Sequence, residues 1–173
     1  KSGGANERFA DLMMFDNNNN LDNEIEILQS RTIMQRVVDE LKLQTAYYAI
    51  GKIKTTNIYK DNPFTLEIMQ LKDSGATFSI KVQLVNDNQF QLNEVQTAYS
   101  YNQPIQYSFG TFKLVKNDAA FLNKSSNDYL VNYMSDEGAV SMARGGLKIR
   151  PVNNRSSVLI LSQITENTKL GKD

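Results

Sequence analysis

The chain has 173 residues, of which 40% are hydrophobic and 22% charged, and its 19 basic side chains balance its 19 acidic ones. This composition is ordinary for a globular protein with one core, and the zero net charge gives no electrostatic basis for binding nucleic acid. The chain has no cysteine and no histidine, which excludes disulfides, thiolate metal sites, cysteine nucleophiles and Ser-His-Asp catalysis.

Residues 1–20 are predicted to be a partly flexible entry segment. Apolar residues spaced three and four apart indicate a short helix over residues 6–15, and the asparagine run at residues 17–20 is typical of a loop. No signal peptide is apparent. The longest aliphatic run is far shorter than the roughly 20 apolar residues that a spanning helix needs. We therefore expect any membrane segments to lie outside this chain.

Residues 21–43 predict one long helix. Asn23 is the expected N-cap, with Glu26 placed as its capping-box partner, and no glycine or proline interrupts the stretch before Gly51. At about 100° per residue, a broad apolar stripe forms on one side. The stripe comprises Ile27, Ser30, Ile33, Met34, Val37, Val38 and Leu41. We expect this stripe to be buried against a sheet.

A narrower second face of the same helix is the candidate interface. It carries Glu24, Leu28, Arg31 and Gln35 at i, i+4, i+7 and i+11. Ser30, within the stripe, is small enough for another backbone to approach closely. The four residues are too polar for a core, which favours contact with another subunit. The alternative is an ordinary solvated surface, in which the methylenes of Arg31 cover part of the stripe.

This helix also resembles a known family. Residues 23–31 (Asn-Glu-Ile-Glu-Ile-Leu-Gln-Ser-Arg), the Val-Val pair at 37–38 and Leu-Lys-Leu at 41–43 are similar to the opening helix of Wzz-type chain-length determinants. These are polysaccharide co-polymerases of the bacterial inner membrane. The resemblance implies a periplasm-facing domain that assembles as a homo-oligomer and regulates the chain length made by a separate polymerase. Larger family members continue into a cytoplasmic tyrosine autokinase.

Strand signals follow the helix. The predicted strands are residues 46–50, 53–58, 64–69, 77–85, 107–109, 111–115, 129–133, 147–152 and 157–163. The clearest is 77–85, in which every second residue from Phe78 to Leu84 is apolar. A turn at residues 86–88 and a resumed alternation at Phe90 predict a hairpin. One apolar and one polar face are typical of an antiparallel sheet.

The C-terminal third predicts helices and strands in alternation. Residues 136–144 read as a short helix capped by Ser135, and Asn167 is the candidate cap of a helix that begins within residues 165–173. Residues 158–161 are apolar on both faces, which predicts a central strand. The fold class expected for residues 1–173 is a single α+β domain. Its mainly antiparallel sheet is packed by one long N-terminal helix and a truncated C-terminal helix.

No catalytic, cofactor-binding or metal site is predicted. The glycine pair at residues 145–146 lacks the spacing and the terminal Lys-Ser/Thr of a phosphate-binding loop, so the kinase activity of the larger family members is not expected here. Acidic residues cluster at the starts of the two predicted helices, at Asp22, Glu24 and Glu26 and at Asp136 and Glu137. Complementarity to the helix dipole accounts for them better than acid–base catalysis.

A tyrosine-rich segment supplies the alternative function. Tyr99, Tyr101 and Tyr107 are candidates for sugar contact, because tyrosine can stack on a sugar ring and bind its hydroxyl groups. Ordinary packing in a sheet is the competing interpretation. The expected function is therefore a non-enzymatic, periplasmic co-polymerase domain in capsular or exopolysaccharide biosynthesis. Its expected partners are further copies and the polymerase, the growing polysaccharide, or both. A carbohydrate-binding module is the alternative, and an adaptor of another envelope complex is a third.

Overall fold

The computed structural model describes residues 21–153, 157–165, 167 and 169–172. Among these residues it has a mixed α+β fold with mainly antiparallel sheets, as the sequence predicts, and four helices. The helix expected over residues 6–15 and the loop at 17–20 lie outside the described residues. No helix in the described part of the chain is long and apolar enough to span a membrane.

The chain divides into two compact units. Unit 1 comprises Lys1–Glu40 and Val140–Ile164, and unit 2 comprises Leu41–Ala139 and Thr165–Asp173. The described part of unit 1 holds the first helix (residues 21–28), most of α2 (Arg31–Leu41) and α4 (Asp136–Gly146), and the strands β10 (Leu147–Pro151) and β11 (Leu159–Gln163). The proposal that residues 1–173 form a single domain stays a prediction.

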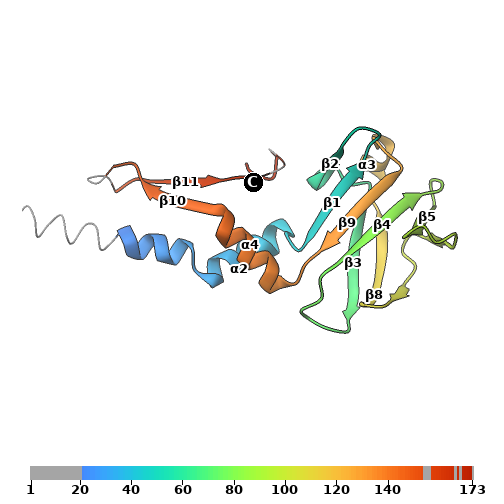
Figure 1. The fold of residues 1–173 in the computed structure, drawn as a ribbon, viewed down its shortest axis with the longest axis horizontal. Helices are drawn as coiled ribbons and strands as arrows, with labels where there is room; N and C mark the ends of the chain where they lie inside the picture. Colours follow the sequence, from blue (N-terminus) through green and yellow to red (C-terminus); the bar gives the residue numbers. More distant parts are fainter. Residues whose placement is uncertain (1–20, 154–156, 166, 168, 173) are drawn as a thin grey trace, which may run out of the picture. The chain divides into compact units, whose positions relative to one another are not determined.

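Unit 2 consists of two antiparallel sheets (Figure 1). The larger has the strand order β2-β1-β9-β4-β5-β6, built from β1 (Thr45–Ile50), β2 (Thr55–Asn57), β4 (Phe78–Leu84), β5 (Gln89–Leu92), β6 (Ala98–Ser100) and β9 (Asp128–Tyr133). The smaller has the order β3-β8-β7, built from β3 (Phe64–Leu71), β7 (Ile105–Tyr107) and β8 (Gly110–Lys116). The 3₁₀ turn η1 (Tyr59–Asp61) and the helix α3 (Asp118–Leu122) connect the strands.

The predicted hairpin is present in the larger sheet. β4 pairs with β5, and Leu84 lies opposite Phe90. Ile80 and Val82 are each 1% exposed, whereas the alternate residues 79, 81 and 83 are exposed. The alternation of apolar and polar residues in the sequence is therefore matched by an alternation in burial.

β1 and β9 are neighbours, although most of unit 2 separates them in sequence. Thr45 lies opposite Tyr133, and the N–H of Met134 donates to the carbonyl of Gln44 at 2.9 Å. The Nε2 of Gln44 also donates to Asp136 Oδ1 at 3.3 Å. The points at which the chain enters and leaves unit 2 are therefore side by side.

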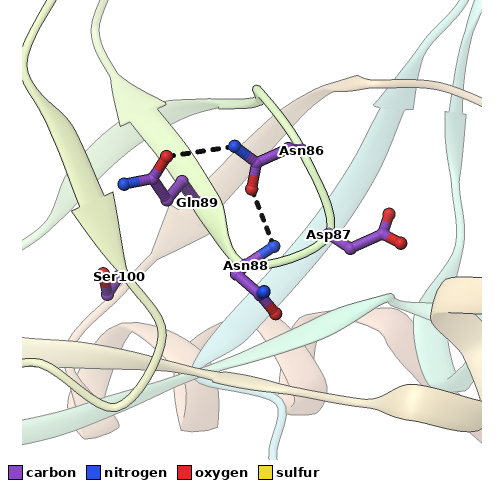
Figure 2. Close-up of a pocket in the computed structure, with 5 residues that line it drawn as sticks. All are labelled: Asn86, Asp87, Asn88, Gln89 and Ser100. Atoms are coloured by element: carbon purple, nitrogen blue, oxygen red, sulfur yellow. Dashed lines mark hydrogen bonds between the residues drawn. The ribbon is translucent and has the colours of Figure 1, made fainter.

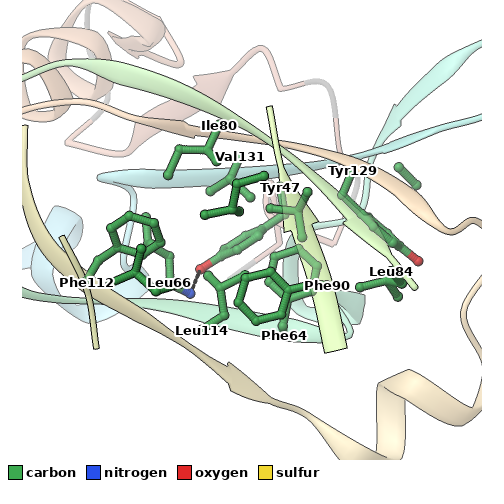
Figure 3. Close-up of a cluster of buried hydrophobic side chains, with 14 of the residues drawn as sticks. Tyr47, Phe64, Leu66, Ile80, Leu84, Phe90, Phe112, Leu114, Tyr129 and Val131 are labelled. Atoms are coloured by element: carbon green, nitrogen blue, oxygen red, sulfur yellow. Dashed lines mark hydrogen bonds between the residues drawn. The ribbon is translucent and has the colours of Figure 1, made fainter. Parts of the chain in front are cut away.

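Side chains from both sheets form one core between them (Figure 3). Phe64, Phe90 and Phe112 are fully buried there. The hydroxyl of Tyr47, on β1, accepts a hydrogen bond from the N–H of Leu66, on β3, at 2.8 Å. Both sheets thus turn their apolar faces inward, and a polar bond within the core also links them.

The long helix differs from its prediction at both ends and in the middle. Leu21 and Asp22 are already helical, so Asn23 lies inside the first helix and is not its N-cap. Residues 29–30 are non-helical, and α2 then runs only to Leu41 (Figure 1). The predicted stretch is therefore two helices with a junction between them.

The apolar stripe is buried only in part, and its buried residues are not members of the core of the sheets, so burial against the sheet stays a prediction. Met34 is 4% exposed and Val38 is fully buried, but neither belongs to the core of the sheets. Among the described residues of unit 1, the other buried ones are Val140 and Ala143 of α4, so α2 contributes the buried part of its stripe to a separate, smaller core. Ile27, at the start of the stripe, is 61% exposed.

Residues 158–161 are not part of a central strand. β11 pairs with β10 in a two-stranded antiparallel sheet, here called the ribbon, in which Ile149 lies opposite Leu161. The predicted cap of α4 is confirmed, because Ser135 Oγ accepts from the N–H of Gly138 at 3.2 Å. Asn167 Oδ1 accepts from the N–H of Lys169 at 2.9 Å, as a cap would, but residues 169–172 form turns.

Candidate functional site

The five candidate interface residues lie on two helical segments. Glu24 and Leu28 belong to the first helix, Arg31 and Gln35 belong to α2, and Ser30 lies at the junction. Glu24 and Arg31 are exposed, and the other three are partly buried. Their common face was predicted from an uninterrupted rotation of about 100° per residue, which residues 29–30 interrupt. The structure therefore does not place them on one continuous helical face.

Ser30 starts α2. Its Oγ accepts from the N–H of Ile33 at 3.4 Å, and its carbonyl accepts from the N–H of Met34 at 3.0 Å. These are the contacts of an N-cap, for which serine is among the preferred residues. Just before it, the N–H of Gln29 completes the first helix by donating to the carbonyl of Ile25 at 2.9 Å. Capping accounts for a serine in an apolar stripe without a close approach of another backbone.

Gln29 was absent from the predicted site and nevertheless links the junction to the ribbon. Its Nε2 donates to the carbonyl of Leu147, the first residue of β10, at 3.5 Å in a partly buried position. The two residues are 118 positions apart. Neither residue type signals such a contact, so sequence periodicity had no means of finding it.

The positive charge of Arg31, at the junction, has opposite effects on the two helices. Arg31 follows the negative end of the first helix and occupies the first position of α2, whose first turn contains no acidic residue. Its charge is favourable at the former position and unfavourable at the latter. Gln35 is engaged within α2, where its Nε2 donates to Asp39 Oδ1 at 3.0 Å. Arg31 therefore contributes little net stability to its own helices.

Two of the tyrosine candidates turn toward the core of unit 2. Tyr99 and Tyr101 both contact Phe90, with ring centroids 6.1 and 5.1 Å apart, and Tyr101 also meets Phe121 edge-on at 6.3 Å. Burial is the main cause that raises the pKa of Tyr101 to about 12. Its hydroxyl is buried and has no hydrogen-bond partner among the described residues. The rings of Tyr99 and Tyr101 therefore pack against the core of unit 2.

Tyr107 lies in the other sheet, on β7. Its ring contacts Phe109 and Phe112, with centroids 5.4 and 6.2 Å away, and its hydroxyl accepts from Asn93 Nδ2 at 2.6 Å. The three tyrosines therefore do not share one set of ring contacts. Tyr99 and Tyr101 pack against the core, and the hydroxyl of Tyr107 is already hydrogen-bonded. Contact of these residues with sugar stays a prediction.

A polar hollow of about 680 Å³ opens beside the turn between β4 and β5 (Figure 2). It is lined by Asn86, Asp87, Asn88, Gln89 and Ser100. Within it, Asn86 Nδ2 donates to Gln89 Oε1 at 3.0 Å, and the N–H of Asn88 donates to Asn86 Oδ1 at 2.9 Å. Ser100 is exposed on β6, whereas Tyr99 faces the core, so the hollow and the ring of Tyr99 lie on opposite faces of this strand.

The acidic groups do not assemble into a cluster that could hold a metal ion in the described part of the chain. No three side chains of the histidine, cysteine, aspartate or glutamate type come together there. Asp136 and Glu137 are exposed in the first turn of α4, where negative charge complements the helix dipole. No chemical role is assigned to them.

The ribbon exposes apolar surface that the predicted site did not include. Val158 and Leu161 are 59% and 55% exposed, and Ile164, just after β11, is 85% exposed. Val158 and Leu161 belong to the run of residues 158–161 that led to the prediction of a central strand, because an apolar run fits burial on both faces. An isolated two-stranded sheet is marginally stable in water, so an apolar ribbon is typical of a surface that packs against something else.

A comparison with models of known protein families found no match, and no curated protein matches the chain. The interpretation of function therefore depends on the helix motif and on the geometry described above.

Proposed function

We propose that this chain is a non-enzymatic domain of a Wzz-type polysaccharide co-polymerase, on the periplasmic face of the bacterial inner membrane. It regulates chain length in capsular or exopolysaccharide biosynthesis through assembly of identical copies. The observation that carries the proposal is the motif at residues 23–31, 37–38 and 41–43. Further copies and the polymerase or the growing polysaccharide are its partners. It needs no cofactor, does not bind nucleic acid, and meets the membrane through segments outside this chain. A larger parent carries any tyrosine kinase domain elsewhere.

The position of the motif supports an assembly role. Its charged residues Glu24 and Arg31 lie on the surface, while Val38 of its Val-Val pair and the nearby Met34 are buried. Since the macrodipoles of the two helices act on Arg31 in opposite directions, its charge is not needed to stabilise them. A charge without a large stabilising role is available for a contact between subunits, where charged groups set specificity and register.

Arg31→Glu in the full-length parent tests the proposal. Because exposed ion pairs contribute about 0–1 kcal/mol, the thermal stability of the purified protein should change little. In the assembled protein, the reversed charge recurs at every contact between copies. We expect a weakened oligomer, measured by native gel or cross-linking, and an altered distribution of polysaccharide lengths, measured by gel electrophoresis of the extracted polymer.

Arg36→Glu is the matched control. Arg36 is also exposed on α2 and undergoes the same change of charge, but it lies outside the quoted motif. The proposal requires Arg31→Glu to alter chain length more than Arg36→Glu. Unchanged assembly and unchanged polysaccharide in the Arg31→Glu parent would contradict it, and loss of folding would show that Arg31 is an internal structural residue.

A second candidate, carbohydrate binding by unit 2, is favoured by the polar hollow. Amide, carboxylate and hydroxyl groups converge there, and such groups pair with the hydroxyl groups of sugars. Titration of the chain with the polysaccharide of the producing strain, followed by calorimetry, tests this function. Binding that Ser100→Tyr abolishes and Tyr107→Phe preserves assigns it to the hollow, and the reverse pattern assigns it to the tyrosines.

A further inference from the structure

The turn between β1 and β2 carries an aliphatic side chain at its apex. The N–H of Gly51 donates to the carbonyl of Lys54 at 3.0 Å, so Lys52 and Ile53 occupy the apex. Ile53 is 99% exposed. Two-residue hairpin turns favour asparagine, aspartate and glycine, and a β-branched side chain has no advantage there. Turn formation therefore does not account for an isoleucine at this position.

Hydrogen bonds and close backbone packing support the base of this turn. A Cβ on Gly51 would lie 2.8 Å from the carbonyl oxygen of Lys54, so only glycine allows the two backbones to approach this closely. Ser126 Oγ, in the segment before β9, donates to the carbonyl of Ile50 at 2.7 Å. Ile53 thus projects from a turn whose base is hydrogen-bonded to a neighbouring segment.

A second aliphatic side chain is exposed beside this turn. Leu122, the last residue of α3, is 86% exposed, whereas Phe121 before it is 3% exposed. The bond between Ser126 and Ile50 joins the segment after α3 to the base of the turn. Figure 1 shows α3 and β2 at the same end of unit 2. Ile53 and Leu122 therefore extend from neighbouring segments, residues 50–56 and 116–128, here called the tip segments.

Lysines accompany these aliphatic side chains. Lys52 and Lys54 flank the isoleucine and are exposed. They form no ion pair with any described residue. The ammonium groups of Lys116 and Lys124 lie 4.4 and 4.1 Å from the centroid of the Phe121 ring. Positive charge is therefore present on both tip segments.

Acidic groups offset only part of this charge. The tip segments together contain four lysines and two aspartates. Asp118 pairs with Lys116 at 3.4 Å, and Asp128 Oδ1 accepts from Gln83 Nε2 at 3.0 Å. The balance of charge at the tip segments is therefore positive, although the whole chain is neutral.

The side-chain types favour a lipid surface over other partners. Aromatic residues and arginine are enriched in protein–protein interfaces, and lysine is depleted there. Sugars stack on exposed aromatic rings, but Phe121 is the only aromatic residue of the tip segments and is buried. Aliphatic side chains that enter the acyl boundary, with lysines that reach the headgroups, are typical of an anionic membrane surface.

We propose that the tip segments bind the surface of a bilayer that contains anionic phospholipids. Ile53 and Leu122 enter the boundary between headgroups and acyl chains, and Lys52, Lys54 and Lys124 pair with the phosphate groups. This contact is additional to membrane segments outside the chain, and it does not rest on the proposed function.

Co-sedimentation of the whole chain with vesicles tests the contact. We expect binding to vesicles of phosphatidylcholine and phosphatidylglycerol, little binding to phosphatidylcholine alone, and weaker binding as salt is raised. Ile53→Ser should weaken binding to the anionic vesicles by about tenfold or more, because it removes an aliphatic side chain from the contact. Ile164→Ser is the matched control. Ile164 is 85% exposed but lies outside the tip segments, so this change should leave binding unaltered.

Lys52→Gln and Lys72→Gln give a second comparison. Lys72 is also exposed, and it follows β3 at the opposite end of unit 2 (Figure 1). Lys52→Gln should weaken binding by about fivefold and Lys72→Gln should not. Circular dichroism melts establish that the variants fold. A natural chain that binds no anionic vesicles at any soluble concentration, or equal effects within either matched pair, overturns the inference.

Tryptophan fluorescence gives an independent readout, because the chain has no tryptophan of its own. With anionic vesicles, the emission of Ile53→Trp should shift to shorter wavelength and be quenched by brominated lipid. The emission of Val95→Trp should not change, since Val95 is 50% exposed between β5 and β6, outside the tip segments. An unshifted emission from vesicle-bound Ile53→Trp, or the same shift with a soluble acidic polysaccharide, overturns insertion into lipid.

Discussion

The rings of Phe78 and Phe109 stack face to face, with centroids 3.5 Å apart and planes inclined by 8°. Phe78 is the first residue of β4 in the larger sheet, and Phe109 precedes β8 in the smaller one. Tyr133, opposite Phe78 on β9, continues the stack at 4.9 Å. The stacked rings therefore tie the two sheets of unit 2 together through partly exposed side chains, outside the fully buried core.

A double-mutant cycle measures this tie. Phe78→Leu and Phe109→Leu keep most of the apolar volume and remove the stacking, so the two changes should show a coupling energy of about 0.5–1.5 kcal/mol in urea denaturation. Phe78→Leu with Phe121→Leu is the control pair, because Phe121 contacts Tyr101 instead. A coupling no larger than that of the control pair would contradict the structural role of the stack.

The buried stripe of α2 should govern the stability of unit 1. Met34→Ala creates a cavity at a side chain that is 4% exposed, so we expect it to lower the free energy of unfolding by about 2–5 kcal/mol. Ile27→Ala is the control, since Ile27 belongs to the same predicted stripe but is 61% exposed and should change stability by less than about 0.5 kcal/mol. Equal losses of stability in thermal denaturation would contradict this difference in burial and would instead fit one continuous, equally buried helix face.

Removal of the buried hydroxyls of Tyr47 and Tyr101 should have different effects on stability. Tyr47→Phe leaves the N–H of Leu66 without its acceptor, so we expect a loss of about 1–3 kcal/mol. Tyr101→Phe removes a hydroxyl that has no partner among the described residues, so the free energy of unfolding should stay unchanged or rise. Urea midpoints of the two variants give the comparison, and a Tyr101→Phe protein as unstable as Tyr47→Phe would contradict it.

Alkaline pH should destabilise unit 2 through Tyr47. Burial raises its pKa from 10.0 to about 12, even though the hydrogen bond from Leu66 lowers it. Between these values the unfolded chain loses the proton and the folded chain keeps it. The contribution of Tyr47 to the free energy of unfolding is therefore fully present below pH 10. As the pH rises from 10 to 12, the free energy of unfolding falls by roughly 1 kcal/mol per pH unit.

Urea midpoints measured from pH 9 to 12 check this dependence. Tyr47→Phe should show a shallower fall than the natural chain, since the other tyrosines whose pKa burial raises, Tyr101, Tyr129 and Tyr133, are common to both proteins. Identical slopes would mean that Tyr47 is not the group that links stability to pH.

Local patterns were sufficient to predict most of unit 2. The strict alternation from Phe78 to Leu84 identified β4, its buried face and its hairpin partner, because burial on one face of a sheet leaves a period of two in the sequence. β9 was also predicted, but its position between β1 and β4 was not. Strand order depends on contacts between residues far apart in sequence, which a local pattern does not record.

Two predictions were wrong for a different physical reason: one uninterrupted helix over residues 21–43 and a central strand at residues 158–161. A serine side chain that competes for backbone N–H groups ends one helix and starts another, and no glycine or proline marks that change at Ser30. An apolar run such as residues 158–161 is the same whether it is buried in a central strand or exposed on a ribbon. The exposed charges of Glu24 and Arg31 were predictable from periodicity, whereas the contact of Gln29 with Leu147 was not.

The neighbouring positions of β1 and β9 also affect how unit 1 assembles. Its two segments, Lys1–Glu40 and Val140–Ile164, are far apart along the polymer, and closing so long a loop carries an entropic cost in the unfolded chain. Once Thr45 lies opposite Tyr133, the two segments start from adjacent points and reach each other at a high effective concentration. A mutation that unravels only the strands of unit 2 therefore weakens unit 1 through chain entropy, without altering any residue in it.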